Sequence, residues 1–242
     1  MNALAAFSFL AVAPVQGFSR LSPVGIGLVI AFVILSLAIH EVAHAWVALQ
    51  RGDTTARDLG RITLNPIPHI DPVMTIIVPV FLAVLSSGAF IFGGAKPVPV
   101  TMSRLKNPLP DMALVALAGP VSNWLLAILF GALYKLSLLH GFYPGAAESY
   151  GERLGQLFPL VMASAMATNL FLALFNLLPI PPLDGSRVMN WLLPAPLREG
   201  YMRLETIGLF LVVGVYYYTP VRDYLNMAVQ GMANLILSWV PA

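Results

Sequence analysis

Long apolar stretches limit what this chain can fold into more than any other feature of its sequence. They cover residues 24–49, 73–95, 112–139, 157–178, 204–218 and 224–240. The first four reach the length of about 20 apolar residues that a helix needs to cross a bilayer. Together the stretches use most of the 242 residues and leave no room for a soluble domain of ordinary size. The sequence predicts an all-α polytopic membrane protein with about five or six membrane helices.

Composition supports this class and excludes several others. Hydrophobic residues make up 58% of the chain and charged residues 10%, whereas soluble domains average about 45–50% and about 25%. This balance excludes a soluble enzyme, a disordered chain and a coiled coil. The absence of cysteine excludes a disulfide scaffold, a thiolate metal site and a cysteine nucleophile. Because the net charge is only +2 and the basic residues are scattered, we expect the lipid bilayer as a partner and no nucleic acid.

Basic residues in the connecting stretches predict an orientation. Residues 50–71, 96–111 and 186–203 carry three Lys or Arg each, whereas residues 140–155 carry one. The positive-inside rule places the first three stretches in the cytoplasm and the fourth outside. With cytoplasmic residues on both sides, residues 73–95 must enter the membrane and return, turning near Ser86–Gly88. The alternative is an ordinary span with one connection that violates the charge rule.

The sequence His40-Glu41-Val42-Ala43-His44 is the strongest chemical signal. On a helix, His40 and His44 share one face, where both imidazoles can bind one Zn²⁺. Glu41 can then act as general base toward a water whose pKa the metal lowers to about 7. Ionisable groups inside an apolar helix are costly and indicate function. The alternative is a polar helix face that lines a water-filled cavity or pairs with arginines.

A zinc site that keeps one position open for water needs a third protein ligand. The candidates are His69, His140, Asp53, Asp58, Asp71, Asp111 and Asp184. His140 falls in the stretch expected outside, far from the cytoplasmic end of the first span. Asp184 follows Pro179-Ile180-Pro181-Pro182, where the prolines end the helix, and Gly185 permits a sharp turn after it. We therefore favour Asp184 over His69.

Three further motifs accompany the histidine pair. Residues 176–185 read Asn-Leu-Leu-Pro-Ile-Pro-Pro-Leu-Asp-Gly, residues 119–123 read Gly-Pro-Val-Ser-Asn, and residues 93–100 read Gly-Gly-Ala-Lys-Pro-Val-Pro-Val. With these motifs the chain resembles the site-2 protease family of intramembrane zinc metalloproteases over about residues 24–190. Residues 176–185 match every fixed position of that family's N-x-x-P-x-P-x-L-D-G signature. Residues 93–100 resemble its re-entrant edge beside the active site.

The resemblance implies a particular site and activity. His40, His44 and Asp184 would bind one Zn²⁺, Glu41 would be the catalytic base, and Asn123 would hold the substrate backbone or stabilise the oxyanion. The substrate would be a transmembrane protein, cleaved within a prokaryotic plasma membrane at a site toward the cytoplasm. We expect a single domain over residues 1–242, with a catalytic core over about 24–190 and accessory helices over about 201–240. No stretch is left for the PDZ or CBS domain of larger members.

Two other functions use the same residues. A membrane zinc hydrolase of a non-peptide substrate could carry the histidine motif, but residues 176–185 argue against it. A metal transporter or sensor would show repeated halves or several intramembrane carboxylates. The apolar stretches offer few charges beyond Glu41, which disfavours that reading. The sequence indicates neither the substrate nor the oligomeric state.

Overall fold

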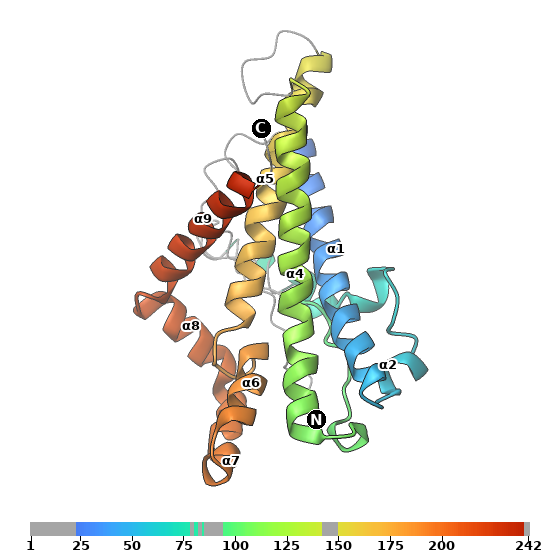
Figure 1. Ribbon diagram of the computed structural model, residues 1–242, viewed down its shortest axis with the longest axis vertical. Helices are drawn as coiled ribbons and strands as arrows, with labels where there is room; N and C mark the ends of the chain where they lie inside the picture. The colour runs from blue at the N-terminus through green and yellow to red at the C-terminus, as the bar shows by residue number, and fades with distance from the viewer. Residues whose placement is uncertain (1–22, 78–79, 82–83, 85–93, 142–149, 240–242) are drawn as a thin grey trace.

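The structure is a computed structural model that describes residues 23–77, 80–81, 84, 94–141 and 150–239. Three long helices lie side by side along its longest axis, α1 (Pro23–Gln50), α4 (Pro108–Leu139) and α5 (Tyr150–Asn176) (Figure 1). The shorter elements are α2 (Thr55–Asp58), η2 (Ile67–His69), η3 (Pro72–Ile77), η4 (Met102–Arg104), α6 (Asp184–Leu192), α7 (Ala195–Arg203), η5 (Leu204–Ile207), α8 (Gly208–Tyr218) and α9 (Val221–Trp239). No strand occurs in the described ranges, so the all-α prediction is confirmed.

The described helices include three that are long and apolar enough to cross a bilayer. They are α1, α4 and the Leu157–Asn176 part of α5. Ala195–Tyr218 and Val221–Trp239 also qualify as a pair, but the chain bends by 76° between them, as in a broken span or a re-entrant loop. The described part of the chain thus supplies three spans, or four with this pair. It does not confirm the predicted five or six, and the predicted turn at residues 86–88 lies outside the described residues.

Several helix boundaries differ from the prediction. α4 begins at Pro108, inside a stretch expected to be irregular. Proline is compatible with this position, because the first turn of a helix does not need its N–H. α5 begins at Tyr150, inside the stretch expected as a loop at residues 140–155. The connector expected at residues 186–203 forms most of α6 and α7. In each case the helix includes residues outside the apolar stretch, prolines in α4 and mostly polar residues in the others, so hydropathy alone did not predict these boundaries.

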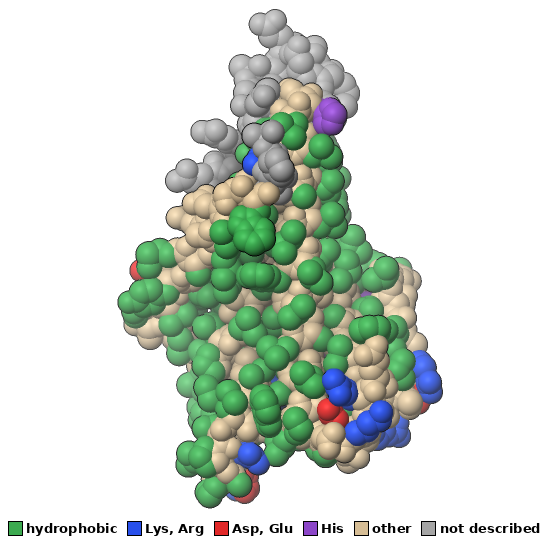
Figure 2. Space-filling view, viewed as in Figure 1, with side chains coloured by type: hydrophobic (Ala, Val, Ile, Leu, Met, Phe, Trp, Pro, Cys, Tyr) green, Lys and Arg blue, Asp and Glu red, His purple; other side chains and the backbone are tan. Residues whose placement is uncertain are grey.

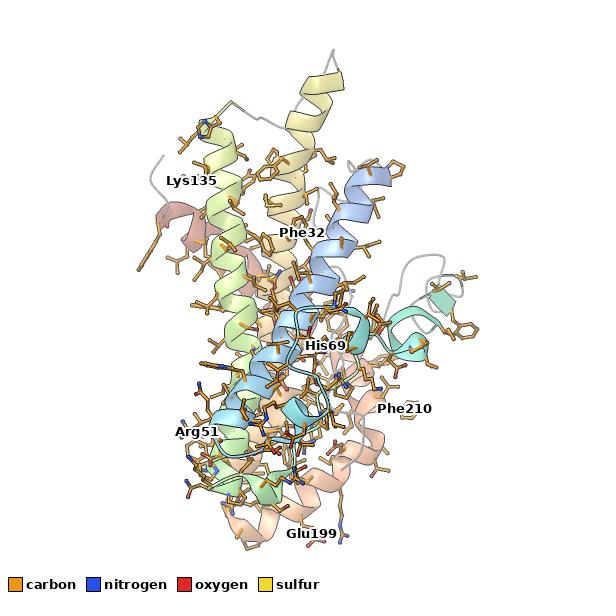
Figure 3. All side chains as sticks on the ribbon, turned by 90° about the vertical axis from the view of Figure 1, so that its right-hand side faces the viewer. Phe32, Arg51, His69, Lys135, Glu199 and Phe210 are labelled. Carbon is orange, nitrogen blue, oxygen red and sulfur yellow. The ribbon has the colours of Figure 1, made fainter. Side chains whose placement is uncertain are left out.

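Side-chain packing holds the three long helices together. Ala127 on α4 and Ala165 on α5 are fully buried, and such small side chains let membrane helices approach closely. Phe32 on α1 packs edge to face on Phe130 of α4, with ring centroids 5.4 Å apart (Figure 3). Tyr216 brings α8 against α5 through its contacts with the rings of Phe171 and Phe175. This core fixes the helix faces that carry the polar groups described below.

The molecule has one charged end. α1 ends where Gly52 takes a φ of +107°, which permits the turn toward α2. Charged side chains gather near α2 and α7, whereas the surface along the long helices is largely hydrophobic (Figure 2). Arg51 and Glu199 lie at this end and Lys135 toward the other (Figure 3). Each of the three stretches reaches this end, through Arg51, Glu199 and Lys106, whose N–H donates to the carbonyl of Arg51. The cytoplasmic orientation of this end stays a prediction.

Candidate metal centre

Two histidines on α1 form the first half of the site. His40 and His44 stand one helical turn apart, and both are buried. Their Nε2 atoms are 3.0 Å apart, and their rings meet edge to face with centroids separated by 4.6 Å. The helical spacing inferred from the sequence therefore places both imidazoles on one face.

Asp184 reaches this pair from a distant part of the sequence. α5 ends at Asn176, the proline-rich residues 177–183 turn the chain, and Asp184 opens α6. Its Oδ2 atom lies 3.2 Å from Nε2 of His40 and 3.4 Å from Nε2 of His44. Ligand atoms from the three residues all lie within 4.8 Å of one another. The structure thus brings together the three residues that the sequence favoured.

Hydrogen bonds fix which ring nitrogen of each histidine carries the proton. Nδ1 of His44 lies 2.7 Å from the carbonyl oxygen of Val115, which can only accept, so this nitrogen donates. Nδ1 of His40 lies 2.5 Å from Oδ1 of Asn123 and donates likewise. Both Nε2 atoms are therefore unprotonated in the neutral rings, and their lone pairs are available to a metal.

The donor set fits a zinc ion. Two Nε2 lone pairs and Oδ2 of Asp184 face one another at 3.0–3.4 Å, and this buried oxygen has no hydrogen-bond partner among the described residues. These electron-rich atoms repel one another unless a cation lies among them. Ligands about 2.1 Å from a tetrahedral ion stand about 3.4 Å apart, close to these separations. Two nitrogens and one carboxylate also leave a fourth position open, as catalytic zinc sites do.

Three of the other candidates for the third ligand form hydrogen bonds elsewhere. His69 donates from Nε2 to the carbonyl of Thr63 at 3.0 Å. Asp53 accepts the backbone N–H of Thr101 at 2.5 Å, and Asp111 accepts that of Asn107 at the start of α4. Within the described ranges, His40, His44 and Asp184 are the one such group of metal-binding side chains.

Glu41 lies beside the three residues and is held by a backbone group. Its Oε2 accepts the N–H of Val98 at 2.7 Å, whereas its Oε1 is buried and has no hydrogen-bond partner among the described residues. A cavity of about 1060 Å³ is lined by Glu41, His44, Asp184 and residues 97–103. One carboxylate oxygen is therefore fixed, and the other is free to accept a proton.

Val98 belongs to residues 96–101, which form neither helix nor strand and which we call the edge segment. Asp53 holds its far end, because its carboxylate accepts N–H groups of both Thr101 and Thr55. Thr55 also donates its hydroxyl to Asp53 at 2.5 Å, and Asp53 itself is only 1% exposed. The edge segment is thus tied to the end of α1, the helix that carries Glu41.

Arg61 holds the near end of the edge segment. Its Nη2 donates to the carbonyl of Lys96 at 2.7 Å, and the N–H of Lys96 donates to the carbonyl of His69. Burial lowers the pKa of Arg61, while the negative charge of Glu41 acts in the opposite direction. Arginine nevertheless remains a cation at neutral pH. The edge segment is therefore fixed at both ends around Val98.

Gly119 on α4 leaves room for the histidine rings. A Cβ at this position would lie 2.5 Å from Cε1 and Nε2 of His40, and closer still to Nε2 of His44. Real Cβ atoms essentially never come this near to another heavy atom. The Gly119–Asn123 motif begins with glycine because α4 crosses directly over the Nε2 atoms of both histidines and leaves no room for a side chain.

Asn123 lies one turn further along α4. It is fully buried, accepts from His40 through Oδ1 and donates from Nδ2 to Oδ1 of Asn169 at 2.8 Å. Its predicted contact with a substrate or an oxyanion is not tested by these bonds and stays a prediction. The bonds of Asn169 to α4 and α1 agree with the role expected of a polar residue in the middle of a span. The roles of Asp53 and Arg61 were not foreseen, although a charged residue beside an apolar stretch is a signal that could have marked them.

Comparison with known proteins places this arrangement in a family. Residues 28–216 match the model of Peptidase family M50, so the chain belongs to that family. Three relatives carry the name "Putative zinc metalloprotease". YwhC of Bacillus subtilis is 40% identical over 193 residues, covering 80% of this chain and 81% of that protein. Rip2 of Mycolicibacterium smegmatis is 31% identical over 193 residues, covering 80% and 67%. MJ0611 of Methanocaldococcus jannaschii is 39% identical over 103 residues, covering 42% and 46%.

The family match confirms the resemblance inferred from the motifs. It spans α1, α4, α5 and α6, and therefore includes His40, Glu41, His44 and Asp184. A search of solved structures found no significant match.

Proposed function

We propose that the chain is an intramembrane zinc endopeptidase that hydrolyses peptide bonds in or near the transmembrane segments of membrane-tethered proteins. The observation that carries this proposal is the position of His40, His44 and Asp184, which converge inside the bundle of apolar helices. The zinc metalloprotease names of three relatives agree with it. So do the lone pairs that the three residues present to one another.

The depth of the site supports a substrate within the membrane. His40 precedes the end of α1 at Gln50 by ten residues. At a rise of about 1.5 Å per residue, this places it about 15 Å from the charged end. The hydrocarbon core of a bilayer is about 30 Å thick, so a site at that depth stands near its middle. A peptide bond that reaches it belongs to a chain in or beside the bilayer.

Glu41 is the general base in this proposal. His40, His44 and Asp184 would hold zinc, which when bound lowers the pKa of a water to about 7 and polarises the scissile carbonyl. The free Oε1 of Glu41 takes the proton of the attacking water and delivers it to the leaving amine nitrogen. The bond from Val98 to Oε2 keeps the carboxylate in one orientation during both transfers.

The edge segment provides a place for the substrate backbone. A transmembrane helix engages its own carbonyls, so it must unwind locally before hydrolysis. No hydrogen bond in the described structure engages the backbone of Val100, so its N–H and C=O can pair with an extended peptide by β-addition. Pro97 and Pro99 lack N–H groups, and Val98 already donates its N–H to Glu41, so Val100 supplies the N–H for pairing among residues 97–100.

Charge indicates how the protein lies in its membrane. Residues 50–71, 96–111 and 186–203 each reach the charged end, and positive residues favour the cytoplasmic side. We infer a prokaryotic plasma-membrane protein whose site opens toward the cytoplasm. Its partners are then the bilayer and a transmembrane protein substrate.

Proteolysis of a labelled single-span substrate in proteoliposomes tests the proposal. Wild type is compared with Glu41→Gln, and zinc content is measured in both proteins. Glu199→Gln is the matched control, because Glu199 is exposed and its partner among the described residues is Arg203, one turn away on the same helix. We expect Glu41→Gln to keep zinc and lose cleavage, while Glu199→Gln keeps both. Equal cleavage by Glu41→Gln contradicts the assigned base. A zinc-loaded wild type that leaves single-span substrates intact favours a non-peptide hydrolase instead.

A further inference from the structure

Asn169 is a buried amide in the middle of a spanning helix. It lies in the apolar part of α5, is 1% exposed, and takes part in three hydrogen bonds. Its Nδ2 donates to the carbonyl of Ala165 at 2.9 Å and to Oγ of Ser36 at 3.0 Å, and its Oδ1 accepts from Asn123. A carbonyl can only accept, so the bond to Ala165 fixes which side of the amide carries nitrogen.

This orientation is passed on toward the histidines. Because Oδ1 of Asn169 faces Asn123, the nitrogen of Asn123 must turn toward it. The oxygen of Asn123 is then left to face Nδ1 of His40, at 2.5 Å. An acceptor at that position requires a proton on Nδ1 and leaves Nε2 free. The donors and acceptors therefore agree along the whole route from α5 through α4 to α1.

Ser36 connects the same route back to α1. Its hydroxyl accepts from Asn169 and donates to the carbonyl of Phe32 at 2.8 Å. Ser36 and His40 are one helical turn apart, so the bonds join three spanning helices in a ring that closes through the backbone of α1. Removing the hydroxyl of Ser36 would take one hydrogen-bond acceptor from Nδ2 of Asn169. The bonds of Asn169 to Asn123 and Ala165 would remain in place.

We infer that Asn169 is a positioning residue for the metal centre. It holds the amide of Asn123 in the one orientation that fixes the ring of His40 with Nε2 directed at Asp184. Partners outside the ligand shell change metal affinity in this way, and their loss typically costs about 10- to 100-fold. The inference rests on the proposed zinc centre, but not on the substrate or on catalysis.

Zinc affinity of the purified protein, measured by competition with a chelating dye, tests the inference. Asn169→Leu removes the acceptor for Asn123 at nearly constant size, and we expect zinc to bind about 10- to 100-fold more weakly. Asn169→Asp is the conservative variant, because burial keeps its carboxyl neutral and able both to accept from Asn123 and to donate. We expect its affinity to remain close to that of wild type.

Ser36→Ala separates positioning from mere helix packing. It breaks one hydrogen bond of the same ring, and a single hydrogen bond between membrane helices contributes little to their packing on average. We expect its zinc affinity to match that of wild type. Equal losses in Ser36→Ala and Asn169→Leu, or no loss in Asn169→Leu, would overturn the inference. So would an Asn169→Asp protein as weak as Asn169→Leu.

A second variant covers the case in which Asn169→Leu does not fold. Asn169→Ser carries a hydroxyl that can bond the carbonyl one turn back, as Ser36 and Ser164 do, but is too short to reach Asn123. We expect the same loss of zinc affinity as for Asn169→Leu, and an unchanged affinity would overturn the inference. If wild type itself fails to bind zinc, it is the proposed function that is wrong.

Discussion

Replacing Gly119 by alanine adds one methyl group at the point where α4 crosses the metal centre. In the structure that carbon would stand 2.5 Å from Nε2 and Cε1 of His40 and nearer still to Nε2 of His44. Ordinary van der Waals contact begins at 3.4 Å, so the rings or the helix must move by at least about 0.9 Å. The histidines cannot yield without moving the atoms that would bind the metal.

The size of the effect follows from these distances. Metal–ligand distances hold within about 0.2 Å, so a shift of about 0.9 Å is several times what the centre tolerates. Overpacking of a core costs about 1–3 kcal/mol. If the strain is relieved only by moving the ligands, zinc binds about 5- to 150-fold more weakly. At an unhindered position in a helix, alanine is more favourable than glycine by about 1 kcal/mol. Helix propensity therefore cannot account for a loss of zinc affinity in Gly119→Ala.

The assay compares zinc affinity and substrate cleavage in Gly119→Ala with those in wild type. Gly27→Ala is the matched control, because it is the same substitution on α1 with nothing within 4 Å of the added carbon. We expect the control to behave as wild type, while Gly119→Ala loses zinc affinity and cleavage together. A Gly119→Ala protein with wild-type affinity and turnover would refute the argument that the two rings and α4 are in closest contact here.

Three further outcomes are expected. Val98→Pro removes the N–H that holds Glu41, a bond to a charged group worth about 1.5–3 kcal/mol, so kcat should fall about 10- to 100-fold with zinc retained. Val98→Ala keeps the N–H and is the control. If kcat fell equally in both variants, the loss would come from the side chain and not from the N–H. Asp53→Asn removes the carboxylate that accepts from Thr101, so the edge segment loosens and KM should rise, whereas Asp58→Asn, at an exposed residue, should leave KM unchanged. A KM that stays at the wild-type value in Asp53→Asn would contradict this anchoring. Removal of zinc by a chelator should abolish cleavage reversibly while circular dichroism keeps its helical signal, because the described helices pack through apolar side chains; loss of helix would show that the metal holds the fold.

The sequence by itself determined the class of fold and the core of the site. Apolar length identified α1, α4 and α5 as spans, because crossing a bilayer requires an uninterrupted hydrophobic helix. The spacing of His40 and His44 fixed their shared face, because helical periodicity is a local property. Prolines before Asp184 ended α5 at a place from which a carboxylate could turn back toward the bundle. These inferences depend on residues that are neighbours in the chain.

Only the tertiary structure decided what surrounds those residues. Asn123 and Asn169 are separated by 46 positions, and Asn169 and Ser36 by 133, so no local pattern could show that they are bonded. The same holds for Val98, whose N–H meets Glu41 across 57 positions. Sequence patterns report which residues can bind a metal or a proton. The packing of helices decides which buried donor meets which acceptor, because that choice depends on contacts between segments far apart in the chain.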